Sequence, residues 1–286
     1  MNEVAVSEVK KRLVQRLKPD YPKGEIQSFF FRLTEKVLGK TRLDLALEPN
    51  LKLTEKQFKQ FRKALNRLKN HEPIQYIIGE TEFYGLRFRV KPSVLIPRPE
   101  TEELVEWILE ENPTDFSAFD IGTGSGCIPI ALASNRENSL IKACDISAEA
   151  LEIAEENAKL NNVKVHFQLQ DIFKLKTAAE KFDILISNPP YVRDLEKAEI
   201  HRNVLNHEPK QALFVPDSDP LIFYRKIAEL APIFLNENGK IYLEINEFLS
   251  QETAELFHQK GFSEIVLKKD MFGKERFLRC GLNPAQ

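Results

Sequence analysis

The stretch that decides the fold is "AFDIGTGSGCIPIALA", residues 118–133. A short apolar run is followed by three glycines at every second position, and then by a second apolar run. This order is typical of a β-strand, a tight turn and an α-helix, in which glycines let the backbone approach a ligand and the helix start offers free N–H groups. Nicotinamide dinucleotide sites carry G-x-G-x-x-G instead, and Cys127 stands where their third glycine is expected, which weakens that interpretation.

Strand-like and helix-like segments alternate from residue 116 onward. The expected strands are 116–121, 139–145, 163–169, 182–187, 239–245, 263–268 and 276–281. This alternation predicts an α/β fold with a seven-stranded, mostly parallel, Rossmann-like sheet and helices on both faces. Because no helix separates the last two strands, we expect an antiparallel strand at the end of the domain.

The first part of the chain has a different pattern, which predicts a small helical bundle. Its apolar residues recur at helical spacing, Gly39 is a natural helix stop, and Thr54 is a natural helix start. The expected core positions are Val6, Val9, Leu13, Leu17, Phe58, Phe61, Leu65 and Leu68. Residues 74–90 are rich in β-formers and glycine and predict a hairpin. The expected domains are therefore a helical substrate-recognition domain over 1–72, a β-hairpin linker over 73–98 and the α/β domain over 99–286.

Composition indicates an ordinary globular protein, with 42% hydrophobic and 29% charged residues among 286. No apolar run approaches the roughly 20 residues that cross a bilayer, and the N-terminus lacks the apolar core of a signal peptide. Cys127, Cys144 and Cys280 are far apart and show no metal or redox spacing. We therefore expect a cytoplasmic protein without a membrane segment or a metal site.

Charge is unevenly distributed along the chain. Residues 1–80 carry a net charge of +7 and the remaining residues −9. The basic part is either a solvated helical surface or a docking surface for an acidic partner, protein or nucleic acid.

Residues at the ends of the second and third expected strands suggest ligand contacts. Asp145 follows the glycine loop by about 20 residues, where a carboxylate can bind both hydroxyls of a ribose, although a lone Asp there could instead cap a helix. Asp171 and Ile172 stand at the next strand end, beside a slot that could hold a base. Ligands of open α/β sheets bind at this edge.

The fourth expected strand ends in "ISNPPYV", residues 186–192. The segment could be only a turn. Alternatively, Pro189 and Pro190 lack N–H groups, so the segment offers mainly acceptors, and Asn188 with a neighbouring carbonyl could hold both hydrogens of an NH₂ group while Tyr191 stacks on it. In that case activity should fall in the order Asn, Asp, Ala at position 188, because Asp retains an acceptor.

"DIGTGSG", "CDIS" and "NPPY", in this order, resemble the class I S-adenosylmethionine-dependent methyltransferases. "YIIGETEFYGLRFRV", "LIPRPETEELVEW", "HEPKQALF" and "KKDMFGKERF" further resemble the peptide chain release factor glutamine N5-methyltransferase (PrmC/HemK) family over essentially the whole chain. Such enzymes methylate the glutamine of the Gly-Gly-Gln motif of class I release factors. The resemblance implies S-adenosylmethionine as cofactor, S-adenosylhomocysteine as product and no metal, in a cytoplasmic protein that we expect to be a monomer.

The resemblance also implies roles for individual residues. The implied cofactor contacts are Gly122, Thr123, Gly124, Ser125, Gly126, Asp145, Asp171, Ile172 and Asn188. The implied catalytic and substrate contacts are Asn188, Pro189, Pro190 and Tyr191, with Phe83 as a further substrate contact. The sequence departs from many relatives at Ile172, where some have Trp, at Asn246, where Gly is common, and at Met271-Phe272, where Leu-Ala is usual. We expect the last two departures to be local changes in turns and packing.

Two other classes remain open. An adenine-N6 methyltransferase acting on DNA or RNA would use the same tetrapeptide on a flipped-out base. The negative charge of residues 81–286 disfavours nucleic acid as substrate. A regulator that binds S-adenosylmethionine without catalysis is disfavoured by the intact "NPPY".

Overall fold

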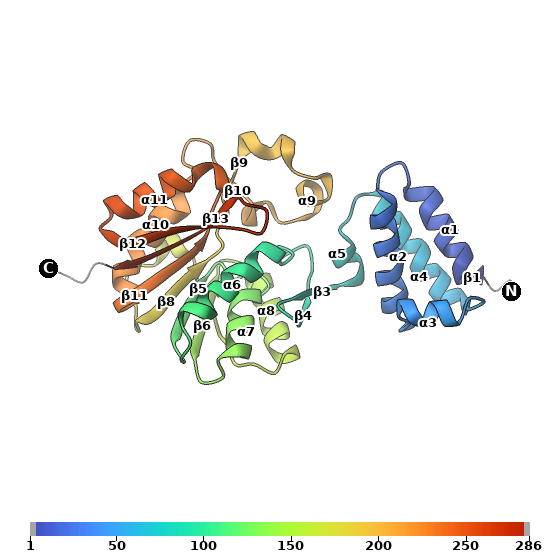
Figure 1. Ribbon diagram of the computed structural model, residues 1–286, viewed down its shortest axis with the longest axis horizontal. Coiled ribbons are helices and arrows are strands. Elements are labelled where there is room, and N and C mark those ends of the chain that lie inside the picture. Colours follow the sequence, from blue (N-terminus) through green and yellow to red (C-terminus); the bar gives the residue numbers. More distant parts are fainter. Residues whose placement is uncertain (1–3, 283–286) are drawn as a thin grey trace. The chain divides into compact units, whose positions relative to one another are not determined.

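The computed structural model describes residues 4–282 and divides into two compact units (Figure 1). Among these residues, one unit comprises 4–79 together with 201–207, and the other comprises 80–200 and 208–282. The segment 201–207 is thus distant in sequence from the helices with which it packs.

The N-terminal unit is a helical bundle with a minimal two-stranded sheet. Its elements are β1 (Val4–Ala5), α1 (Val6–Leu17), α2 (Lys23–Leu38), α3 (Arg42–Leu47), β2 (Lys52–Leu53), α4 (Glu55–Lys69), α5 (Ile74–Ile78) and α9 (Arg202–His207). Gly39 ends α2 in a left-handed conformation, and the Thr54 hydroxyl caps α4 by accepting from the Gln57 N–H. All eight expected core positions belong to one hydrophobic cluster, which confirms the predicted helical faces.

The segment after the bundle differs from its prediction. Residues 74–78 form the short helix α5 rather than a strand, and Gly79 ends it at φ +78°. The isoleucines favour a strand by propensity, but burial of Ile74 and Tyr76 in the helical unit decides the conformation. The hairpin itself is shorter, with β3 (Glu80–Phe83) paired antiparallel to β4 (Leu86–Arg89).

The second unit contains the predicted seven-stranded sheet, in the order β12-β13-β11-β8-β5-β6-β7. Its strands are β5 (Ser117–Ile121), β6 (Leu140–Asp145), β7 (His166–Leu169), β8 (Phe182–Ser187), β11 (Leu235–Glu244), β12 (Phe262–Lys269) and β13 (Glu275–Leu282). Strands β5 to β8 and β11 pair in parallel, whereas β13 is antiparallel to both neighbours. The last strand is therefore antiparallel, as expected, and it lies one position in from the sheet edge. A separate parallel pair joins β9 (Val192–Arg193) and β10 (Phe214–Val215).

Helices cover both faces of this sheet (Figure 1). Helices α6 (Pro99–Glu111), α7 (Cys127–Asn135) and α8 (Ala148–Leu160) bury one face, and α10 (Ile222–Phe234) and α11 (Ser250–Gln259) bury the other. Successive strand residues point to opposite faces, so that Ala118 packs in the first core and Phe119 in the second, where it stacks on Phe182 and Phe234. The α/β fold class is confirmed.

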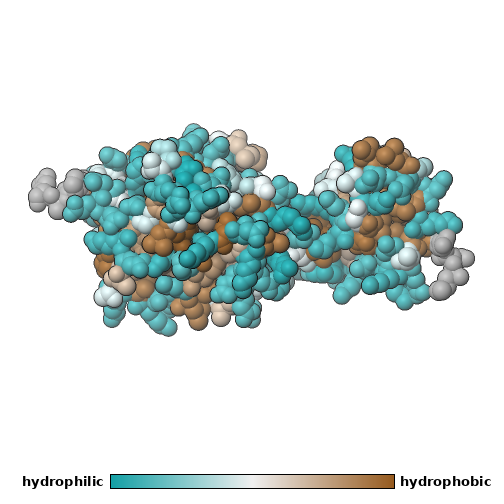
Figure 2. All heavy atoms as spheres, turned by 90° about the horizontal axis from the view of Figure 1, so that it is seen from below, coloured by the Kyte–Doolittle hydropathy of each residue, from teal (hydrophilic) through white to brown (hydrophobic). Residues whose placement is uncertain are grey.

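The surface of each unit is mainly hydrophilic on the face seen in Figure 2, with hydrophobic residues between the polar ones. Scattered exposed apolar residues of this kind are normal for globular domains. Within residues 4–282, no helix combines the length and the apolar character that crossing a membrane requires.

Candidate active site

A single cavity at the carboxyl ends of the parallel strands gathers most of the residues that the sequence singled out. The sequence-predicted residues that line it are Gly122, Thr123, Gly124, Ser125, Asp145, Asp171, Ile172, Asn188, Pro189 and Pro190. These residues come from four strand ends, β5, β6, β7 and β8, which the sheet order places side by side. Gly126, Tyr191 and Phe83 are not among the residues that line the cavity.

The glycine loop has two kinds of glycine. Gly122 and Gly124 have positive φ, and a Cβ at either would meet nothing within 4 Å. Gly126 also has positive φ, but its added Cβ would lie 3.0 Å from Ile130 Cδ1 and 3.1 Å from Ala154 Cβ. The first two glycines therefore shape the turn and leave room beside it, and the third permits α7 to pack closely on α8.

Asp145 lies at the cavity, whereas the cap of α8 is Ser147, whose hydroxyl accepts the Ala150 N–H at 3.2 Å. The Asp145 carboxylate accepts the Gly124 N–H at 2.8 Å and the Ser147 N–H at 2.9 Å, which braces the glycine loop and the start of α8. Asp145 also lines the cavity. Each carboxylate oxygen has more than one lone pair, so these backbone bonds leave acceptor capacity for a ligand hydroxyl.

The slot beside Asp171 and Ile172 is more apolar than the sequence indicated. Asp171 caps a short helical turn by accepting the Phe173 N–H at 2.9 Å. Phe173 and Phe223 both line the cavity, and their rings lie 5.3 Å apart. An aromatic wall therefore stands next to Ile172. Phe173 directly follows Ile172 in the sequence, but nothing in the pattern separated it from ordinary core residues.

Asp120 is a buried carboxylate that the sequence analysis missed. It is 1% exposed, and within the described residues neither of its oxygens, nor the Thr123 hydroxyl oxygen, has a hydrogen-bond partner. Burial raises the pKa of Asp120 to about 7, the nearby Thr123 hydroxyl acts in the opposite direction, and the negative charge of Asp145 adds to the rise. An unpartnered carboxylate below a ligand loop fits a cationic ligand group. The charged residue within the apolar run "AFDI" was the available signal.

We expect Asp120→Asn to stabilise the cofactor-free protein at pH 8 and to weaken cofactor binding about tenfold or more. The free Asp side chain has a pKa of about 3.9, so wild-type stability falls as pH rises from about 4 to about 7, and the variant escapes this loss. The melting temperature at pH 8 should rise by about 3–8 °C, with little change at pH 4. Exposed Asp115→Asn is the matched control, and equal melting curves for Asp120→Asn and wild type at pH 8 would contradict the assignment.

Asn188 is held by a carboxylate from another strand. The Asn188 Nδ2 donates to Glu244 Oε2 at 2.8 Å, and the Thr101 hydroxyl donates to the same oxygen at 2.7 Å. Glu244 ends β11 and is 2% exposed. Neither partner could be recognised in the sequence, because a Glu at a strand end and a Thr in the first turn of α6 carry no recognisable spacing.

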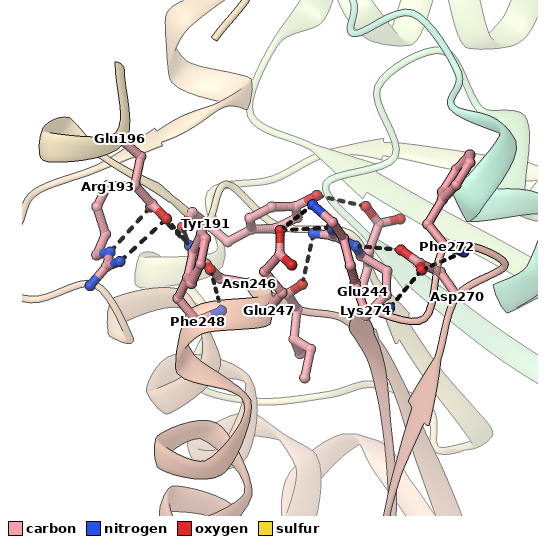
Figure 3. A network of polar contacts seen from close by, with 12 residues as sticks. Tyr191, Arg193, Glu196, Glu244, Asn246, Glu247, Phe248, Asp270, Phe272 and Lys274 are labelled. Atoms are coloured by element: carbon pink, nitrogen blue, oxygen red, sulfur yellow. Dashed lines mark hydrogen bonds and ion pairs between the residues drawn. The ribbon is translucent and has the colours of Figure 1, made fainter. Parts of the chain in front are cut away.

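Tyr191 and Phe83 lie elsewhere than expected. The Tyr191 hydroxyl donates to Glu244 Oε1 at 2.8 Å, and its ring packs in the core that α10 and α11 cover (Figure 3). Phe83 is 0% exposed and packs edge-to-face on Phe88 with the ring centroids 5.9 Å apart. Neither ring lines the cavity, so the structure gives both rings packing contacts, and contact of Tyr191 or Phe83 with the substrate stays a prediction.

The two departures from relatives are local. Asn246 is buried and donates to the Tyr191 carbonyl at 2.9 Å and to Glu196 Oε2 at 3.0 Å (Figure 3). Met271 and Phe272 form an exposed turn, at 60% and 67% exposure. No group of three or more His, Cys, Asp or Glu within residues 4–282 is arranged to hold a metal ion.

Comparison with known proteins defines first the class and then the family. Residues 100–213 match the profile described as "Methyltransferase small domain". A solved methyltransferase from Pyrococcus furiosus has the same fold, with a TM-score of 0.51 and 21% identity over 78% of this chain and 98% of that one. The second unit is thus a methyltransferase domain of the Rossmann-like kind.

The first unit and the curated relatives identify the family within the methyltransferases. Residues 24–79 match the profile described as "PrmC N-terminal domain". A release factor glutamine methyltransferase from Flavobacterium psychrophilum is 49% identical over 94% of this chain and 96% of its own length. Another, from Bacteroides thetaiotaomicron, is 43% identical over 92% and 95%. The chain belongs to the release factor glutamine methyltransferase family.

Proposed function

We propose that this protein transfers a methyl group from S-adenosylmethionine to the side-chain amide nitrogen (N5) of the glutamine in the Gly-Gly-Gln motif of class I peptide chain release factors, and so modulates translation termination. The observation that carries the proposal is the placement of Asn188, Pro189 and Pro190 in the same cavity as the glycine loop and Asp145. Family membership over most of the chain supplies the substrate class.

The residues around the cavity fit S-adenosylmethionine by their chemistry. Asp145 offers acceptors for ribose hydroxyls, and Ile172 and Phe173 offer an apolar wall for a base. Asp120 does not line the cavity, but it lies two residues before Gly122 and would attract a cationic methionine portion from beneath the glycine loop. Bound S-adenosylmethionine supplies an activated methyl group on a sulfonium. Since this donor is already activated, the proposed reaction needs no metal.

The protein's part in the reaction is to position the amide. An amide nitrogen is a weak nucleophile because its lone pair is delocalised, so its alignment with the methyl carbon decides the rate. Asn188 Oδ1 and a carbonyl of the proline segment would each accept one N–H of the substrate, which fixes the plane of the amide. Orientation of this kind is worth roughly 7–11 kcal/mol in favourable cases. The nitrogen becomes strongly acidic once methylated, so no dedicated general base is required.

Adenine in DNA or RNA is the alternative substrate, because a flipped adenine would present the same NH₂ group to Asn188. The net charge of −9 on residues 81–286 favours the protein substrate over a polyanion. An assay with labelled cofactor and with release factor, DNA and RNA in competition tests the proposal. Label on the release factor supports it, and label confined to nucleic acid overturns it.

The basic helical unit is proposed to bind the release factor, in a monomeric, cytoplasmic enzyme. Exposed Lys56, Lys59 and Lys63 lie on one side of α4. Reversal of all three charges to Glu should raise KM for whole release factor about 5–20-fold at low salt, because electrostatic steering is lost. Cofactor affinity should not change.

Reversal of three exposed lysines of the methyltransferase unit, Lys159, Lys164 and Lys181, is the control for net charge. Charge reversal on the surface is preferable to deletion of the N-terminal unit, because residues 201–207 pack with that unit and would lose their partners. Equal KM values for the α4 variant and the control would rule out docking on α4.

A further inference from the structure

The side-chain amide of Asn188 could lie in either of two orientations that have almost the same shape and opposite chemistry. One orientation presents an oxygen acceptor to the cavity, and the other presents an NH₂ donor. Only the first can hold the N–H groups of a substrate amide. A contact within the protein must therefore fix the Asn188 amide in one of the two orientations.

Glu244 is placed to fix this orientation, because it accepts a hydrogen bond from the nitrogen of the Asn188 amide. Its side chain receives three donors: Asn188 Nδ2 at 2.8 Å and Thr101 Oγ1 at 2.7 Å on Oε2, and the Tyr191 hydroxyl at 2.8 Å on Oε1. The Asn188 Nδ2 also lies 3.4 Å from the Thr101 hydroxyl. The nitrogen end of the Asn188 amide is thus engaged by Glu244 and Thr101, while Asn188 itself lines the cavity.

The charge state of Glu244 decides whether the Asn188 amide is held with its nitrogen toward Glu244. Burial raises the pKa of Glu244, and nearby Glu100 adds to the rise. The hydrogen bonds from Thr101 and Tyr191 and the positive charge of Arg276 act in the opposite direction. An ionised carboxylate only accepts hydrogen bonds, so an Asn188 oxygen turned toward it would be repelled.

We propose that Glu244 is a positioning residue, whose carboxylate locks the Asn188 amide with its oxygen toward the substrate nitrogen. The inference rests on the proposed function and adds a residue to it. It also explains Tyr191, which acts on the substrate through Glu244 rather than by stacking. Tyr191 and Thr101 hold the carboxylate, the carboxylate holds Asn188, and Asn188 holds the substrate.

The first test exchanges the amide and the carboxylate between positions 188 and 244, with Glu244→Gln and Asn188→Asp made singly and together. Glu244→Gln should lower kcat about 10–50-fold with cofactor affinity within about threefold of wild type, because a Gln amide accepts Asn188 in either orientation. Asn188→Asp should lose more, because two carboxylates would then share one buried contact. In the double variant, the new glutamine amide can donate to the new aspartate, which keeps its second oxygen for the substrate. We expect the double variant to recover at least about tenfold over Asn188→Asp alone.

Tyr224→Phe is the matched control, because the Tyr224 hydroxyl donates to the Glu244 backbone carbonyl at 3.2 Å and not to its carboxylate. This substitution removes a buried hydrogen bond to the same residue. In the wild-type background it should change kcat by no more than about twofold, and in the double variant it should leave the recovered kcat within about twofold. Wild-type kcat in folded Glu244→Gln, or no recovery in the double variant, overturns the positioning role.

Tyr191→Phe gives a second test that preserves the ring. Loss of the hydroxyl raises the pKa of the Glu244 carboxylate further, so the acidic limb of the kcat–pH profile should move to higher pH. Thr101, Tyr191 and Asn188 donate to this carboxylate, and the other charged or titratable groups that interact with it are Arg276, Glu100, Tyr224 and Cys127. An unchanged profile would contradict the coupling of Tyr191 through Glu244.

A third readout does not depend on methyl transfer. The side-chain NH₂ signals of Asn188, identified by their absence in Asn188→Ala, should shift between wild type and Glu244→Gln in NMR spectra. Unchanged signals overturn the contact with Glu244, whatever the enzyme's substrate. A wild-type enzyme inactive on release factor, but with shifted signals, instead overturns the proposed function and retains the positioning role.

Discussion

Asn188→Ala should lower kcat on release factor by about 10²–10³-fold, the scale of one lost positioning contact in a water-excluded site. The variant keeps the glycine loop, Asp145 and the apolar slot, so cofactor affinity should change far less than kcat. The loss is expected to exceed any change in stability, because Asn188 is only partly buried and its partner Glu244 retains two hydroxyl donors.

The structure changes what is expected of Asn188→Asp. From the sequence, this variant retains an acceptor and should rank above Asn188→Ala. In the structure, the substitution removes the Nδ2 that donates to Glu244 and places a second carboxylate about a hydrogen bond's length from the first. Because two carboxylates that close cannot both ionise readily, we now expect Asn188→Asp to be no more active than Asn188→Ala at neutral pH.

Steady-state kinetics beside thermal melts of both variants measure these effects. A turn without chemistry would lose activity only in proportion to lost stability. A well-folded Asn188→Ala enzyme with near-normal kcat would therefore remove the acceptor role of "NPPY".

Asp145→Ala should weaken S-adenosylmethionine binding by about 1.5–3 kcal/mol, which is roughly a 10–150-fold rise in Kd. Two losses combine in this value: the acceptor offered to the ribose, and the brace on Gly124 and Ser147. Calorimetric titration of the variant measures the change.

Asp183→Ala is the matched control for the brace. Asp183 likewise accepts a backbone N–H, that of Ser117 at 2.8 Å, and the Ser117 hydroxyl at 2.7 Å, but it does not line the cavity. The Kd of the Asp183→Ala variant for S-adenosylmethionine should match that of the wild type. Unchanged affinity in Asp145→Ala would remove this residue from the cofactor site.

The sheet could be predicted from the sequence because each parallel strand is a short buried run followed by a turn and an amphipathic helix. The same regularity located the strand ends, and so placed Asp145, Asp171 and Asn188 at one edge of the sheet. Helix α5 was missed because local β-propensity and tertiary burial disagree over residues 74–78. The packing of residues 201–207 with the helical unit has no local signal at all.

The residues that support Asn188 were harder to predict from the sequence than the residues that line the cavity. Glu244 and Thr101 lie 56 and 87 residues from Asn188 in sequence, and only the strand order β11-β8 and the start of α6 bring them into contact. Tyr191 lies in a different place from the one that its sequence position suggested. Its place in the tetrapeptide suggested contact with the substrate, while the turn after Asn188 directs its ring into the core and its hydroxyl to Glu244.

The most direct test of the central claim is the location of the transferred methyl group. Purified enzyme is incubated with S-adenosylmethionine and a class I release factor, and the factor is then digested and mapped by mass spectrometry. We predict one added methyl group, on the side-chain amide of the Gly-Gly-Gln glutamine, and none with the Asn188→Ala enzyme. A release factor that remains unmethylated under conditions in which the enzyme methylates adenine would contradict the account.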